Sequence, residues 1–82
     1  MTYLNTHIQH FISDCVIRHA KRDSIVLGKN TYTFSTRYGK FLVPFYSIEC
    51  EQTKLQFEIH GNHQHYNRLV EAIEKDLNNK GE

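Results

Sequence analysis

The change of hydrophobic period that decides the fold lies in residues 55–77, LQFEIHGNHQHYNRLVEAIEKDL. Leu55, Phe57 and Ile59 alternate with polar residues, as they would in a half-buried strand. After Gly61 the apolar residues recur at the spacing of one helix face. They are Tyr66, Leu69, Val70, Ile73 and Leu77. The stretch therefore predicts a strand followed by an amphipathic helix.

The same two-residue period runs through the middle of the chain. Apolar residues alternate with polar ones in residues 31–36 and 46–50, and residues 24–27 are a short apolar run. Turn-forming residues stand between these stretches, at 28–30, 39–40 and 51–53. The sequence thus predicts an antiparallel meander of three or four strands between Ser24 and His60.

A change of phase interrupts this pattern near Pro44. Before it, the set expected to face inward is Phe41, Val43 and Phe45. After it, the inward set is Tyr46, Ile48 and Cys50. A shift of one residue turns every side chain to the other face, so we predict a bulge or break at this point. Since proline has no N–H to donate, we also predict that Pro44 lies on an edge strand.

Residues 2–19 show helical spacing again. Their apolar arc consists of Leu4, Ile8, Phe11, Ile12, Cys15, Val16 and His19. Two amphipathic helices and a half-buried sheet can bury their apolar faces against each other in two layers. We therefore predict an α+β sandwich with the order α-β-β-β(-β)-α, in which residues 1–82 form a single small domain.

Length and composition restrict the class of protein. The chain has 82 residues, of which 39% are hydrophobic and 12% aromatic, which fits a small core and excludes a multidomain enzyme or a disordered chain. We find no signal-peptide pattern and no apolar run of the roughly 20 residues that span a bilayer. Cys15 and Cys50 are too few for the disulfide framework of a small secreted domain. We therefore expect a cytoplasmic protein without a membrane partner.

Basic residues are concentrated in one stretch, although the formal net charge is only +1. Between Arg18 and Lys40, six basic residues are accompanied by one acidic residue, Asp23. Aromatic residues are interleaved with them, as in proteins that stack bases on rings and hold phosphates with Lys or Arg. Nucleic-acid binding is therefore an alternative function. Its contact residues would be Lys29, Tyr32, Arg37, Tyr38 and Lys40. The same pattern also fits a core strand that packs under a helix.

Three histidines, His60, His63 and His65, lie within six residues. Imidazoles this close together can bind Zn²⁺, Ni²⁺ or Cu²⁺. A structural zinc site would need a further ligand from elsewhere in the fold, and the alternative is a polar turn with solvated rings. We expect no metal and no other cofactor.

Motifs of catalysis are missing from the sequence. It contains no GxSxG, HExxH, Walker-type glycine loop or CxxC. Glu49, Glu51 and Glu58 alternate with apolar residues, as exposed strand positions do. We therefore expect a protein without enzymatic activity.

Surplus apolar surface on the first helix indicates a partner. Tyr3 and Ile17 lie outside the apolar arc, and together with Val16 they form the candidate partner-binding set. A small core with extra apolar surface favours docking on another protein, or on a second copy as a homodimer. The sequence thus predicts a small regulatory or inhibitory binding module, of the stand-alone kind that phages and other mobile elements encode.

Overall fold

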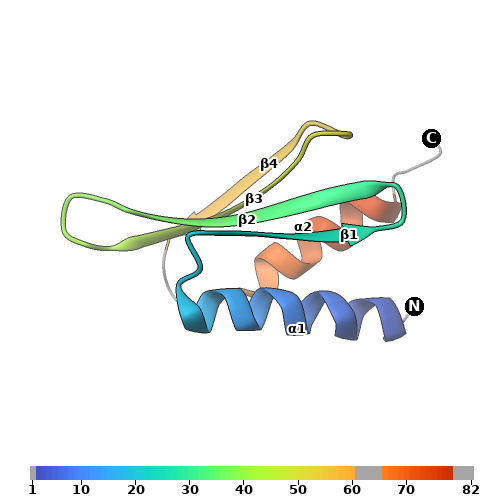
Figure 1. Ribbon diagram of the computed structural model, residues 1–82, viewed down its shortest axis with the longest axis horizontal. Coiled ribbons are helices and arrows are strands. Elements are labelled where there is room, and N and C mark those ends of the chain that lie inside the picture. The colour runs from blue at the N-terminus through green and yellow to red at the C-terminus, as the bar shows by residue number, and fades with distance from the viewer. Residues whose placement is uncertain (1, 61–65, 79–82) are drawn as a thin grey trace.

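The computed structural model describes residues 2–60 and 66–78 and confirms the predicted α+β sandwich (Figure 1). The elements in chain order are α1 (Thr2–Arg18), β1 (Arg22–Leu27), β2 (Asn30–Tyr38), β3 (Pro44–Cys50), β4 (Leu55–His60) and α2 (Asn67–Asn78). The four strands form one antiparallel sheet in the order β1-β2-β3-β4. Both helices lie against the same face of this sheet (Figure 1).

The core lies between the helices and the inner face of the sheet. Its fully buried side chains are Ile8, Ile12, Cys15 and Val16 from α1, Tyr32 and Phe34 from β2, Tyr46, Ile48 and Cys50 from β3, and Leu69 and Ile73 from α2. The rings of Phe34 and Tyr46 stack across the two central strands, with 5.7 Å between their centroids. The predicted inward set Tyr46, Ile48 and Cys50 is confirmed.

A hydrogen-bond network that runs from the core to the surface connects α2 to the sheet. The hydroxyl of Tyr32 donates to Asp76 Oδ2 at 2.7 Å and accepts from Asn30 Nδ2 at 3.1 Å. Thr53 in the turn before β4 donates to the same carboxylate oxygen at 2.8 Å. Burial, and secondly the bond to Asp76, raises the pKa of Tyr32. Because buried polar groups cost free energy unless they are bonded, this network favours one position of α2 on the sheet.

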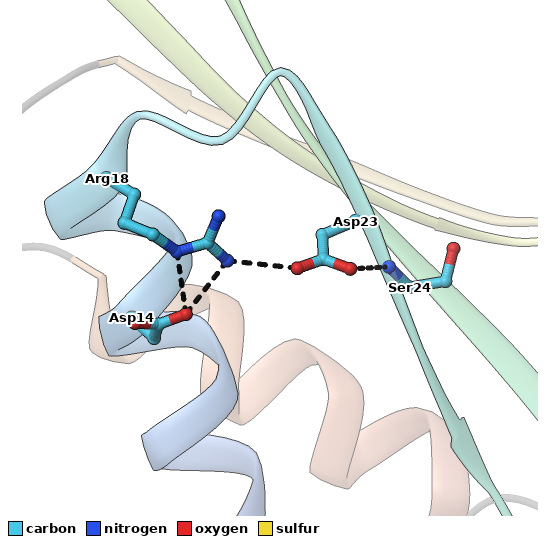
Figure 2. Close-up of polar contacts among 4 residues, drawn as sticks. All are labelled: Asp14, Arg18, Asp23 and Ser24. Carbon is cyan, nitrogen blue, oxygen red and sulfur yellow. Dashed lines mark hydrogen bonds and ion pairs between the residues drawn. The ribbon is translucent and has the colours of Figure 1, made fainter.

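The junction between α1 and β1 is closed by a cap and a salt-bridge cluster. His19 has a φ of 50°, its N–H donates to Val16 O, and the N–H of Ala20 donates to Cys15 O, which is the Schellman pattern of helix ends. Figure 2 shows Arg18 between two carboxylates, Asp14 at 2.8 Å and Asp23 at 3.0 Å. The chain therefore reverses tightly from helix into sheet.

The structure corrects the prediction for residues 41–45. Phe41 and Val43 lie in the β2–β3 turn and are exposed, and Phe45 lies on the outer face of the sheet opposite Arg37. The predicted edge position is also wrong, because β3 lies between β2 and β4. Pro44 is tolerated there because it is the first residue of its strand.

Candidate docking surface

Residues 38–43 comprise the last residue of β2 and the turn that leads to β3, and they carry most of the large apolar side chains that are exposed among the described residues. We call this segment the hairpin apex. It extends past the C-terminal end of α1, away from the two-layer body (Figure 1). Six large apolar side chains are exposed among the described residues, and four of them belong to the apex. These four are Tyr38 (55% exposed), Phe41 (86%), Leu42 (79%) and Val43 (42%). Clustered exposure of this kind marks interaction surfaces, whereas isolated apolar residues are common anywhere.

The apex is a hydrogen-bonded turn with a defined shape. Gly39 N–H donates to Val43 O at 2.9 Å, and Leu42 N–H donates to Gly39 O at 3.1 Å. These bonds enclose a three-residue loop, whose third position normally adopts the left-handed conformation. Leu42 occupies this position with a φ of 60°.

Leucine is an unfavourable residue at this position. Glycine is the usual choice there, since the left-handed conformation costs other L-residues roughly 1–2 kcal/mol. The other two non-glycine residues with positive φ among those described, His19 and Lys54, have polar side chains. Leu42 instead combines backbone strain with an apolar side chain that is almost fully exposed. Strain of this kind concentrates at functional sites.

Contacts on both faces of the sheet support the base of the apex. On the helix side, the Tyr38 ring stacks on His19 with 6.4 Å between centroids. On the outer side, the Arg37 guanidinium lies 4.7 Å from the centre of the Phe45 ring and is paired with Glu58 at 2.9 Å. A Cβ at Gly39 would lie 2.6 Å from Phe45 Cε2, so this ring packs directly against the turn. The apex therefore projects from a well-packed base.

The partner-binding set predicted on the first helix does not form one surface. Val16 is 1% exposed and belongs to the core, so it is unavailable to a partner. Ile17 is 70% exposed, as its position outside the apolar arc predicts. The side chain of Tyr3 lies outside the described residues.

The residues predicted to bind nucleic acid are also dispersed. Tyr32 is fully buried beneath the helices, where it cannot stack on a base. Lys29 and Lys40 lie in the turns at opposite ends of β2. Arg37 is engaged by Glu58, which leaves Tyr38 and Lys40 as neighbours in the apex.

The structure describes only one of the three clustered histidines. His63 and His65 lie outside the described residues, while His60 is exposed on β4 and its ring makes a T-shaped contact with Phe45, with 4.9 Å between the centroids. Within residues 2–60 and 66–78, no group of three or more His, Cys, Asp or Glu side chains comes together. Cys15 and Cys50 are free and buried, and burial raises the pKa of the Cys15 thiol to about 11.

The sequence contained one signal for the apex that the strand pattern obscured. Phe41, Leu42 and Val43 are three consecutive apolar residues between Gly39 and Pro44. Such a run does not alternate, and its flanking residues are turn formers.

In the part of the chain that the structure describes, no helix carries an apolar stretch of the length needed to cross a bilayer. No protein-family model, curated protein or solved structure matches the chain.

Proposed function

We propose that this protein is a non-enzymatic binding module that docks on another protein through the hairpin apex and thereby regulates or inhibits it. The observation that carries the proposal is Leu42, which is 79% exposed and has a φ of 60°. A glycine here would favour folding. A leucine in its place is therefore best explained by a requirement for its side chain in binding.

The defined shape of the apex favours a protein partner over other surfaces. The turn bonds at Gly39 fix the direction of Phe41 and Leu42, and a fixed direction matters most when an apolar side chain must enter a matching pocket. A bilayer makes no such demand. Nucleic acid would require a row of free basic residues, whereas Arg37 is paired with Glu58.

This geometry supports a steric mechanism, in which the bound module blocks access to the functional surface of its partner. Phe41 and Leu42 would act as anchors in a pocket of the partner, and Lys40 would lie at the rim of the contact. The module measures 41 × 24 × 17 Å, so its body would cover the partner's surface around that pocket.

Cross-linking from the apex tests the proposal. A photoreactive amino acid at Phe41 should cross-link a partner in cells, whereas the same group at Val26, which is 67% exposed on β1, should not. With that partner purified, Phe41→Ala should raise the dissociation constant roughly thirtyfold, as expected of an anchor residue.

Two alanine variants of other exposed apolar residues serve as controls. Val26→Ala should leave the affinity unchanged. Ile17→Ala tests whether docking uses the outer side of α1 instead of the apex, because the Ile17 side chain is also largely exposed, at 70%. Weaker binding by Ile17→Ala together with unchanged binding by Phe41→Ala would show that docking uses α1 and not the apex.

A further inference from the structure

The two edge strands of the sheet differ in their protection against pairing with another strand. β1 carries a charged residue, Asp23, on its inner side, opposite Phe34 and bonded to Arg18 of α1 (Figure 2). An inward-pointing charge is one of the devices by which proteins prevent association at a sheet edge. β1 is therefore a protected edge.

β4 carries no inward-pointing charge, and its one acidic residue, Glu58, lies on the outer row, paired with Arg37. Its inner row consists of Leu55, Phe57 and Ile59, and its six residues all pair in regular register with β3. No proline, inward charge or bulge interrupts it. Among the described residues, β4 thus presents the less protected edge, on the opposite side of the sheet from β1.

The inner row of β4 is covered at Ile59 and only partly covered at Leu55 and Phe57. A groove of about 380 Å³ lies between β4 and α2, with Leu55, Phe57 and Ala72 as its apolar lining and four charged residues of α2 along its wall. The charged residues are Arg68, Glu71, Lys75 and Asp76. Leu55 and Phe57 are only half-buried. A strand added beside β4 would place its own inner side chains over this lining and complete the burial.

We propose that β4 pairs antiparallel with β4 of a second copy of this chain, around a two-fold axis at Phe57. In this register Leu55 lies opposite Ile59 of the second copy, and Phe57 lies opposite its own counterpart. The inner row would then be apolar throughout. On the outer row Gln56 lies opposite Glu58 of the second copy, where an amide can donate to a carboxylate.

Charge disfavours one of the neighbouring registers. Moving the axis to Glu58 would place two Glu58 carboxylates directly opposite each other, and although each is paired with Arg37 of its own copy, like charges at this position weaken a strand pair. This homodimer uses a sheet edge and not the hairpin apex, so it is independent of the proposed docking function. It would leave both apices free, at opposite ends of the continuous sheet.

Sedimentation equilibrium over a wide concentration range tests the proposal. The wild-type chain should associate reversibly to a dimer. Gln56→Glu places a carboxylate opposite each Glu58 of the other copy, so the dimer dissociation constant should rise about tenfold. Because the new carboxylate also faces Glu49 of β3 in its own copy, urea denaturation should first show that the variant is folded under the conditions of the measurement. Gln56→Lys should not raise it. Ser24→Glu, the matched change on the outer row of β1, should leave it unchanged, and because both positions are exposed these variants should fold.

Hydrogen exchange of the wild-type protein gives a second readout that needs no variant. Protection of the β4 amides that face outward should rise with protein concentration, while protection of the β1 amides should not. A chain that stays monomeric at every concentration overturns the proposal. So does a dimer that Ser24→Glu weakens as much as Gln56→Glu does.

Discussion

Tyr32 shows how one buried polar atom can fix the position of a helix. Its hydroxyl is the bond partner of both Asn30 and Asp76, so Tyr32→Phe should leave two polar groups with fewer partners. We expect a loss of about 1–2 kcal/mol in the free energy of unfolding, measured by urea denaturation. Tyr46→Phe is the control, because its hydroxyl lies at a longer 3.3 Å from His19 Nδ1. Equal losses in the two variants would argue against a special role of the Tyr32 network.

Cys15 should be chemically inert in the folded protein. Burial raises the pKa of its thiol to about 11, and the reactive thiolate is therefore scarce at neutral pH. Alkylation of Cys15 by iodoacetamide, followed by mass spectrometry, should occur only at the rate at which the protein opens. Rapid labelling of the native chain would contradict the burial of this side chain.

At the scale of elements, burial explains which predictions succeed. Strand β4 and helix α2 follow the sequence closely because alternate or helically spaced apolar residues, such as Phe57 and Ile73, have one face to bury. The prediction that Phe41 and Val43 face inward on a strand is wrong for a physical reason. Their apolar side chains continue the strand pattern, but the turn bonds at Gly39 place them outside the core. A pattern of hydrophobicity cannot distinguish apolar residues that the core buries from apolar residues that a turn leaves exposed.

Because of the salt bridges at the α1–β1 junction, the free energy of unfolding should depend on pH in the acidic range. The bond from Arg18, and secondly the N–H of Ser24, lowers the pKa of Asp23 below its ordinary value of 3.8. A carboxyl group with a lowered folded-state pKa stabilises the fold above its unfolded pKa, and this contribution is lost as the pH falls through the folded pKa.

Arg18→Gln tests this linkage. The variant should be slightly less stable than the wild type near neutral pH, because the pair is exposed to solvent. The difference should shrink as the pH falls below 3.8, the ordinary pKa of Asp23. Urea denaturation along a pH series measures it, and a difference that is constant across the series would show that Asp23 titration is not involved.

At the scale of the whole molecule, the fold separates a packed body from a projecting apex. The body buries its apolar residues between helices and sheet, while the apex exposes Phe41 and Leu42 from a hydrogen-bonded turn. Sequence patterns predicted the body well. The apolar run between Gly39 and Pro44 was a signal for the apex, but the φ of 60° at Leu42 could not be predicted, because leucine disfavours this backbone conformation.

Leu42→Gly tests most directly whether the apex is kept for binding at the expense of folding. Relief of left-handed strain exceeds the entropic cost of glycine in the unfolded chain, so the free energy of unfolding should rise by about 0.5–1 kcal/mol. Affinity for the partner cross-linked at Phe41 should fall in the same variant. A more stable variant that binds this partner less tightly is the predicted result. A variant that binds as tightly as the wild type would contradict the assignment of the hairpin apex as the docking surface.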